Sequence, residues 1–318
     1  MKIDIICTLG PISESKDSIL KLAKAGMSVA RLNFSHGTYK DHQKMINFIR
    51  EINNETDFNI KIMGDLCGPK IRTQNKLPIS VIKNEELILG KDLKISHPEI
   101  IQDLKLNEII LIDDGKISFK VKSINPTIIV ANESCTIHPH KGINFPNTKL
   151  KINTTTEKDL KDLKFALKNN FEIIAQSFVR NGSDIKNLKE LCKNQKPQIC
   201  AKIETPEALE NIKEITFESD LIMIARGDLA VEMPFYDLFK NENIIIKECK
   251  KQQKDFIVAT QMLNNMMYSN TPSRAEIIDI SYSITNGASG LLLSNETSVS
   301  ENYLKSTSVL KKLIDEVK

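Results

Sequence analysis

The amino-acid sequence predicts an α/β protein built as a (β/α)8 TIM barrel, with a small all-β lid domain inserted after the third strand. Eight short apolar runs are nearly continuous rather than alternating, which is typical of parallel strands covered on both faces. Segments of helical periodicity separate most of these runs, and eight strands alternating with helices is the number found in such a barrel. A doubly wound open sheet is the alternative, because the pattern does not show closure.

The eight candidate strands are read directly from the apolar runs. In order they are IDIICTL (3–9), SVARLNF (28–34), NIKIMGDL (59–66), EIIAQSFV (172–179), QICAKIE (198–204), LIMIARGD (221–228), FIVATQM (256–262) and GLLLSNE (290–296). Amphipathic helices are expected between them, for example over residues 15–26, 183–194 and 273–287. The first and last of these end in glycine, and serines at helix starts are suited to capping them.

One stretch interrupts this alternation between the third strand and its helix. From about residue 73 to 151 the sequence has short β-branched runs, such as EIILIDDGKISFKVKSI, with turn residues and no clear helix. We therefore expect the barrel over residues 1–72 and 152–318 and a β-rich domain over residues 73–151. An insertion at this point lies over the carboxyl face of the barrel, so a lid is expected. His138 and His140 flank a proline there, and we interpret them as a turn rather than a metal site because no third ligand accompanies them.

Composition excludes several classes of function. The chain has 318 residues, with 41% hydrophobic and 27% charged residues, and a formal net charge of +3. Such a small net charge favours neither nucleic acid nor an anionic membrane as partner. The six cysteines contain no Cys-x-x-Cys pair and several lie in apolar runs, which indicates reduced, buried thiols. No leader pattern opens the chain and no apolar run reaches the roughly 18 residues of a membrane span. These features predict a cytoplasmic protein.

Polar residues gather where the predicted strands end. In a barrel these carboxyl ends converge on one mouth. Glu204 and Asp228, on adjacent strands, would make an oxygen-ligand site for Mg²⁺ or Mn²⁺. Cationic side chains beside them would suit a phosphorylated or carboxylated anion. The whole set comprises Arg31, Asn33, Ser35, Asp65, Arg72, Lys202, Glu204, Asp228, Thr260, Ser294 and Glu296. The residues alone thus predict a metal-assisted barrel enzyme that acts on a small anionic substrate.

Each of these residues also has a simpler interpretation. Lys202 and Glu204 stand two apart on a strand, and could form only an ion pair. Thr260 and Ser294 could be capping hydroxyls. Arg-Gly-Asp at 226–228 could be an adhesion loop, but it follows an apolar strand in a chain that reads as cytoplasmic. The repetition of polar residues at the same position of most strands favours the active-site interpretation.

The motifs also resemble those of the pyruvate kinase family. They are IICTLGPIS, GMSVARLNFSHG, GDLCGPKIR, AKIETPEALEN, IMIARGDLAVE, VATQMLNNM, TPSRAE and LLLSNETS, in the order of the family. The resemblance covers nearly the whole chain and includes LIDDGKISF and HKGINFP in the β-rich segment. It implies a (β/α)8 barrel with a β-rich lid.

The resemblance implies transfer of a phosphoryl group from phosphoenolpyruvate to ADP, giving pyruvate and ATP in glycolysis. Glu204 and Asp228 would hold Mg²⁺ or Mn²⁺, and Lys202 would neutralise the transferred phosphoryl group and the enolate. The backbone at Gly227 and Asp228 would bind the substrate carboxylate. Further roles follow by motif: Thr260 with Ser294 and Glu296 in protonation of the enolate, Arg31 and Arg72 at the phosphate, and Pro11, Asn33, His36, Lys141 and Asp113 at the nucleotide.

The chain departs from the common family pattern at the monovalent-cation pocket. Many members bind K⁺ with equivalents of Asn33, Ser35, Asp65 and a following Thr, within DTKGPEIR. This chain has DLCGPKIR, so Leu66 and Lys70 replace the Thr and the Glu, as in the K⁺-independent branch. Our hypothesis is that the Lys70 ammonium replaces K⁺, which would then not be required. The alternative is that Lys70 points to solvent.

The sequence ends at what reads as the last barrel helix, so the family's carboxyl-terminal domain, and with it sugar-phosphate allostery, is expected to be absent. A homo-oligomer through the later barrel helices is expected to remain possible. Two other functions deserve comparison. A divalent-metal lyase or aldolase acting on pyruvate enolate would need neither LNFSHG nor the lid motifs. A catalytically degenerate scaffold subunit would have lost catalytic residues, whereas Lys202, Glu204, Asp228 and Thr260 are all present.

Overall fold

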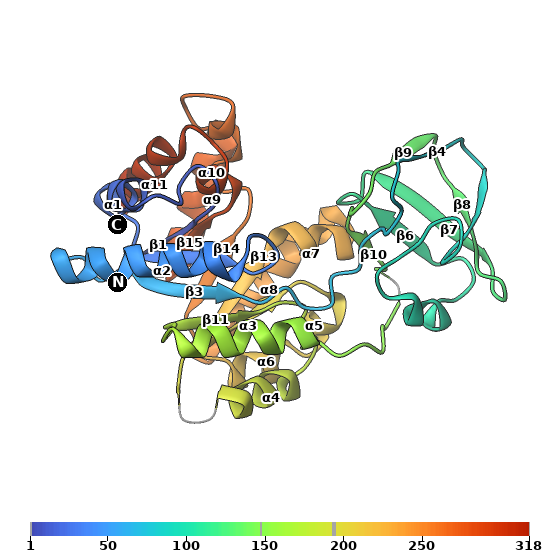
Figure 1. Ribbon diagram of the computed structural model, residues 1–318, viewed down its shortest axis with the longest axis horizontal. Helices are drawn as coiled ribbons and strands as arrows, with labels where there is room; N and C mark the ends of the chain where they lie inside the picture. The colour runs from blue at the N-terminus through green and yellow to red at the C-terminus, as the bar shows by residue number, and fades with distance from the viewer. Residues whose placement is uncertain (1, 147, 193–194, 318) are drawn as a thin grey trace.

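Eight parallel strands close into a barrel surrounded by helices (Figure 1), as the sequence predicted. The computed structural model describes residues 2–146, 148–192 and 195–317. Around the barrel each strand pairs with its neighbours, and the pairing of Asp4 with Gly290 joins the last strand to the first. The open-sheet alternative is therefore wrong. The strands are β1 (Asp4–Thr8), β2 (Val29–Asn33), β3 (Lys61–Asp65), β11 (Ile173–Gln176), β12 (Gln198–Ile203), β13 (Leu221–Ala225), β14 (Phe256–Ala259) and β15 (Gly290–Leu293).

Helices connect the barrel strands and begin at the capping residues that the sequence indicated. The Ser15 side chain accepts a hydrogen bond from the amide of Ser18, and Ser273 forms a capping box with Glu276. The helix expected over 183–194 is α4, and residues 193–194 lie outside the described residues. The α-helices are α1 (Lys16–Ala25), α2 (Tyr39–Glu55), α3 (Glu157–Lys168), α4 (Gly182–Cys192), α5 (Pro206–Glu210), α6 (Ile212–Glu218), α7 (Arg226–Glu232), α8 (Leu238–Lys251), α9 (Arg274–Thr285), α10 (Asn295–Ser298) and α11 (Tyr303–Val317).

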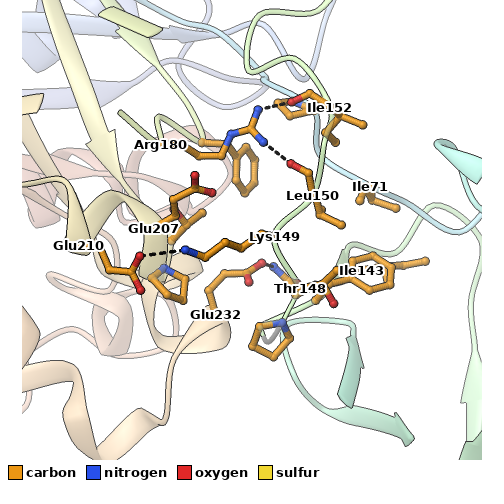
Figure 2. A pocket seen from close by; sticks show the side chains of 17 residues that line it. Ile71, Ile143, Thr148, Lys149, Leu150, Ile152, Arg180, Glu207, Glu210 and Glu232 are labelled. Atoms are coloured by element: carbon orange, nitrogen blue, oxygen red, sulfur yellow. Dashed lines mark hydrogen bonds and ion pairs between the residues drawn. The ribbon is translucent and has the colours of Figure 1, made fainter. Parts of the chain in front are cut away.

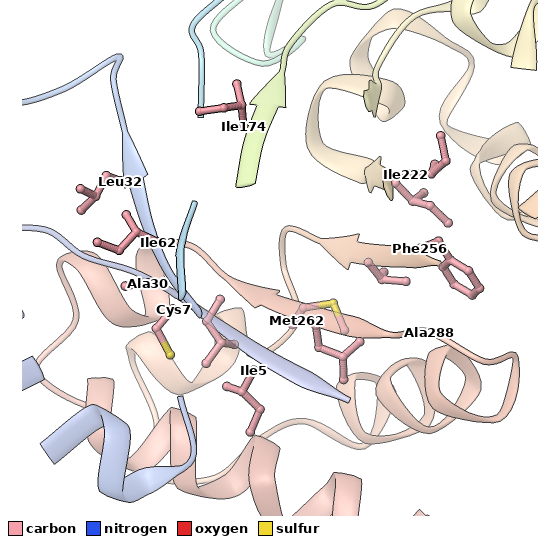
Figure 3. Close-up of a cluster of buried hydrophobic side chains, with 14 of the residues drawn as sticks. Ile5, Cys7, Ala30, Leu32, Ile62, Ile174, Ile222, Phe256, Met262 and Ala288 are labelled. Atoms are coloured by element: carbon pink, nitrogen blue, oxygen red, sulfur yellow. The ribbon is translucent and has the colours of Figure 1, made fainter. Parts of the chain in front are cut away.

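The barrel strands are apolar throughout because both of their faces are buried. In β1, Ile5 and Cys7 belong to the cluster between strands and helices (Figure 3), whereas Ile6 belongs to a second cluster that includes Met63 and Met223. Successive side chains on a strand point to opposite faces, so a continuous apolar run fills both layers. Burial raises the pKa of the Cys7 thiol to about 12, which leaves it unreactive.

The segment between β3 and α3 forms seven further strands with a core of their own. Five form an antiparallel sheet in the order β10-β6-β7-β8-β5, and β4 pairs with β9. Phe119, Ile110 and Ile129 are fully buried among them. The bounds are β4 (Ile79–Val81), β5 (Glu86–Ile88), β6 (Ile109–Ile112), β7 (Ile117–Ser123), β8 (Ile128–Ala131), β9 (Cys135–Ile137) and β10 (Ile143–Asn144), with a 3₁₀ helix, η1 (Pro98–Asp103). We call residues 73–151 the β-rich segment.

The β-rich segment projects from one end of the barrel in Figure 1 and contacts helices that follow barrel strands. The Asn144 side chain donates a hydrogen bond of 2.6 Å to Glu232 at the end of α7, and Lys149 pairs with Glu210 of α5 at 3.1 Å. These two helices start at the carboxyl ends of β13 and β12. The β-rich segment therefore lies against the face where active sites of barrels are found. Within the described ranges, no helix combines the length and apolarity that a bilayer crossing requires.

Candidate active site

Lys202 lies at the centre of the polar residues that the strand ends bring together. Its Nζ lies 2.9 Å from Glu204 Oε1 and 3.3 Å from Asp65 Oδ1, and donates a hydrogen bond of 2.7 Å to Ser177 Oγ. Lys202 and Glu204 point the same way because they stand two residues apart on an extended segment. The Lys202 side chain is only 11% exposed, so its charge acts in a poorly hydrated environment.

Asp65 joins Lys202 to Arg31. The Arg31 guanidinium binds Asp65 Oδ2 through Nη2 at 2.6 Å and Nε at 2.8 Å, and its Nη1 donates to Thr8 Oγ1. Burial alone would raise the pKa of Asp65, but the charges of Lys202 and Arg31 outweigh burial and hold that pKa below its ordinary value. Asp65 therefore stays ionised and fixes both cations.

Glu204 and Asp228 are the two carboxylates that could hold a divalent cation. Burial raises the pKa of Glu204; Lys202 opposes this, and the negative charge of Asp228 adds to it. Glu204 Oε2 accepts the amide of Phe178, while buried Oε1 receives no hydrogen bond from the described residues, although the Lys202 ammonium is close. A divalent cation between the carboxylates would relieve their repulsion. Within the described chain, no group of three or more His, Cys, Asp or Glu side chains is placed to hold a metal ion.

Lys70 points into this site rather than to solvent. Its Nζ lies 3.0 Å from Asp228 Oδ1, and its side chain is 24% exposed. Burial lowers the pKa of Lys70, but the carboxylate of Asp228 more than compensates and the pKa is raised overall. The Leu66 side chain is buried and has only carbon atoms, and Asn33 Oδ1 accepts the amide of Ser35. The solvent-facing alternative for Lys70 is therefore not what the structure has.

Thr260 lies against Gly227 in an unusual backbone conformation. Thr260 has φ of 73°, in the left-handed region that β-branched residues rarely adopt, and its buried Oγ1 has no hydrogen-bond partner in the described chain. A Cβ on Gly227 would lie 3.5 Å from Thr260 Oγ1. The Arg226 guanidinium holds this loop by donating to the Thr260 carbonyl, and it pairs with both oxygens of Asp279. Buried in this way, Arg226 is not part of an adhesion loop.

Replacing Thr260 with glycine is expected to raise the free energy of unfolding by about 0.5–1 kcal/mol, because glycine adopts positive φ without strain. Replacing it with alanine is expected to change stability little, because the strain remains and the lost hydroxyl makes no hydrogen bond. Urea unfolding of the two variants and the wild type measures both effects. A glycine variant that is less stable than the alanine variant would contradict the strain argument.

Ser294 and Glu296 follow β15, and Glu296 binds the loop that contains Thr260. The Glu296 carboxylate accepts the amide of Leu263 through Oε1 and that of Ser294 through Oε2, at 3.2 and 2.8 Å. Among the described residues no hydrogen bond links either residue to Thr260 Oγ1. The structure therefore brings Glu296 to this loop without showing a proton relay.

The residues expected at the nucleotide lie on both the barrel and the β-rich segment. Pro11 is exposed in the turn after β1, and His36, shortly after β2, is exposed as well. Partial desolvation, and then the charges of Arg72, Arg31 and Lys70, lower the pKa of His36. Arg72 Nη1 donates to the carbonyl of His140. In the β-rich segment, Lys141 Nζ lies 2.8 Å from Asp113 Oδ1.

Two residues of the site were missed from the sequence. Ser177 stands just after β11, accepts a hydrogen bond from Lys202 and donates one of 2.6 Å to the Leu66 carbonyl. It could have been found by including the fourth strand when polar residues at strand ends were aligned. Glu232 ends α7 and has no sequence signal, because only the fold brings Asn144 to it.

Glu232 makes stability depend on pH. Burial raises the pKa of its carboxyl group to about 7, although the Asn144 hydrogen bond opposes this. Because this pKa lies above the unfolded value, Glu232 contributes stability that is full below about pH 4.5 and is lost as the pH rises through about 7. The Glu232→Gln variant should therefore gain about 1–3 kcal/mol over the wild type between about pH 5 and pH 8. Urea unfolding of both proteins across this range gives the difference in the free energy of unfolding. The prediction would be contradicted if that free energy changed with pH equally in the two proteins.

Comparisons with known proteins agree with this architecture. The family model described as the barrel domain of pyruvate kinase matches residues 1–307. The chain is 37% identical over 319 residues to a pyruvate kinase of Geobacillus stearothermophilus, covering 94% of this chain and 54% of the relative. It is 37% identical over 315 residues to a pyruvate kinase of Staphylococcus aureus, covering 93% and 53%. The chain thus spans about half the length of the curated relatives it matches.

A solved structure is also similar over nearly the whole chain. It is the crystal structure of a pyruvate kinase from Cryptosporidium parvum, with a TM-score of 0.93 and 33% sequence identity. The match covers 99% of this chain and 69% of that one. With its closed barrel and a family model that matches all but the last residues, this chain belongs to the pyruvate kinase family.

Proposed function

We propose that the protein transfers a phosphoryl group from phosphoenolpyruvate to ADP and so forms pyruvate and ATP. The observation that carries this proposal is the placement of Lys202 between Glu204 and Asp65 at the mouth of the barrel, in a chain of this family. A buried ammonium beside two carboxylates suits a reaction in which phosphoryl and enolate charge must be neutralised in turn.

Lys202 would supply the positive charge during transfer. Its Nζ donates to Ser177 and lies close to Asp65 and Glu204, which hold the ammonium in a poorly hydrated position. The preorganised charge needs little rearrangement when the phosphoryl group leaves the enolate oxygen. Arg31 and Arg72 would bind phosphate oxygens beside it, and Asp65 keeps the Arg31 guanidinium oriented.

Glu204 and Asp228 would hold Mg²⁺ or Mn²⁺, which when bound supplies charge neutralisation at the substrate carboxylate and phosphate. The backbone amides at the start of α7 would bind the substrate carboxylate, and Gly227 leaves space for its approach. Thr260 Oγ1 lies next to Gly227 with no protein partner, so it is free to hydrogen-bond substrate or water. We assign it to protonation of the enolate carbon, with Ser294 and Glu296 behind it.

The β-rich segment would act as a lid that completes the nucleotide site. Pro11, Asn33 and His36 belong to the barrel, whereas Lys141 and Asp113 belong to the β-rich segment. In this arrangement Lys141 is paired with Asp113, and closure over ADP would turn that ammonium toward the nucleotide phosphates. The barrel is proposed over residues 1–72 and 152–318.

Three further properties are proposed. The aromatic side chains of Phe235 and Tyr236, just before α8, and of Phe239, in its first turn, are 76%, 75% and 64% exposed, which supports a homo-oligomer through the barrel helices. All six cysteines are free, which supports a reducing compartment such as the cytoplasm. The Lys70 ammonium is proposed to replace K⁺.

Pyruvate formation from phosphoenolpyruvate and ADP with Mg²⁺ tests the function. The expected result is equal turnover in K⁺ and in a buffer whose only monovalent cation is tetramethylammonium. Turnover only in K⁺ would support the phosphotransferase activity and contradict the proposal that Lys70 replaces K⁺. No turnover in either, from folded protein, would contradict the proposed function.

A further inference from the structure

A cavity of about 260 Å³ lies between the β-rich segment and the barrel (Figure 2). One wall comes from residues 69–71, β10 and the chain that returns toward α3. The other comes from residues after β11, from α5 and from the end of α7. Of the described residues that line the cavity, none is among those proposed to bind phosphoenolpyruvate, the divalent cation or the nucleotide.

The cavity has an apolar side and an acidic side. Ile71, Ile143, Leu150 and Ile152 contribute to the apolar side. On the acidic side lie the carboxylates of Glu207 and Glu210, from α5, and of Glu232, from α7.

Both cations in the lining are already engaged. The Arg180 guanidinium donates to the carbonyls of Leu150 and Ile152, and Lys149 pairs with Glu210 at 3.1 Å. Within the described chain no ion pair reaches Glu207 or Glu232, and Glu232 accepts only the amide hydrogen bond of Asn144. Two carboxylates therefore face the cavity without a cationic partner.

This combination selects the chemistry of a ligand. An anion would be repelled by the carboxylates, and a neutral apolar molecule would displace their water without replacing its hydrogen bonds. A cationic head on an apolar body satisfies both sides. The Lys149 ammonium shows that such a head fits beside Glu210, and its side chain is 74% exposed, so that this pair is weak and easily displaced.

We propose that this cavity binds a small amphipathic cation, a short aliphatic chain that ends in a primary ammonium group. The ammonium would lie between Glu207 and Glu232, and the chain would pack on Ile143 and Leu150. The volume admits on the order of eight non-hydrogen atoms, if each takes roughly the space of one water molecule. A bound ligand would touch both the β-rich segment and α7, whose first turn carries Gly227 and Asp228.

Titration calorimetry of the full chain with n-pentylammonium chloride at about pH 8, above the pKa of about 7 of Glu232, tests this site. Wild type is expected to bind one equivalent, with 1-pentanol at least about tenfold weaker because it lacks the charge. Glu207→Gln and Glu232→Gln should each weaken n-pentylammonium binding about tenfold. Glu157→Gln is the matched control, because it removes a carboxylate from the exposed start of α3, outside the cavity, and should bind like wild type.

Three results would overturn the proposal: no saturable binding, equal binding of 1-pentanol, or wild-type affinity in both cavity variants. Glu207 lines the cavity, and its side chain makes no hydrogen bond or ion pair in the described chain, so Glu207→Gln tests the ammonium site without removing a contact of the fold. Binding is measured without substrate, so failure of the phosphotransferase assay would leave this proposal standing, and the reverse also holds.

Discussion

The Lys202→Met variant is expected to lower kcat for pyruvate formation by about 10³-fold or more, at saturating phosphoenolpyruvate, ADP and Mg²⁺. Methionine has nearly the length of lysine without its charge, so the change removes the ammonium and little volume. The Lys202 side chain is 11% exposed, and in so poorly hydrated a site no mobile cation easily replaces a fixed one. The steady-state rate is the measurement.

The same change is also expected to cost stability, which must be separated from chemistry. Asp65 keeps its pair with Arg31, but Glu204 loses its charge partner in a buried position, at a cost of about 3–5 kcal/mol. Thermal unfolding and circular dichroism show whether the assayed protein is folded. Lys202→Arg restores charge but not shape, so we expect it to recover stability more than rate.

Lys189→Met provides the matched control for Lys202→Met. It removes a lysine that pairs with Asp220 at 2.9 Å. Asp220 directly precedes β13 and therefore lies at the end of the barrel opposite the active site, so the change should leave kcat unchanged. More than a tenth of the wild-type kcat in folded Lys202→Met would contradict the role assigned to Lys202.

The barrel could be predicted because its sequence signal is local and repeated. A strand buried on both faces must be apolar throughout, as in β13, where every residue from Leu221 to Ala225 is buried. Once closure is assumed, the carboxyl ends of the strands meet, so Lys202, Glu204 and Asp228 could be placed at one mouth from sequence alone. Element limits differ slightly, since the first strand was expected over 3–9 and runs from Asp4 to Thr8.

The partners of these side chains could not be predicted in the same way. Lys70 and Asp228 are 158 residues apart, so their contact depends on the closed barrel as a whole. Asn144 and Glu232 are 88 apart, and their contact depends on how the β-rich segment lies against the barrel. In the sequence, Arg226 is part of a tripeptide typical of exposed loops, whereas in the structure its side chain pairs with Asp279. The cavity between the two parts likewise has no sequence pattern, because its walls come from five separate stretches of chain.

Replacing Lys70 with methionine is expected to lower turnover by about 10²-fold or more in tetramethylammonium buffer, and K⁺ should not restore it. The ammonium of Lys70 lies 3.0 Å from Asp228, so its removal takes positive charge from the substrate pocket. K⁺ needs oxygen ligands, and at the position after Asp65 the buried Leu66 side chain has none. Steady-state rates in the two buffers are the measurement.

A double variant distinguishes a replaced cation from a simple partner of Asp228. Lys70→Glu with Leu66→Thr restores the hydroxyl and the carboxylate of the common family pattern, and should make turnover depend on K⁺. Leu66→Thr alone keeps the ammonium and should stay independent of K⁺, at a stability cost of about 1–3 kcal/mol for the buried leucine. If Lys70 served only to pair with Asp228, the double variant would be inactive in both buffers. The dependence of turnover on K⁺ therefore distinguishes the two roles of Lys70, which a loss of turnover alone does not.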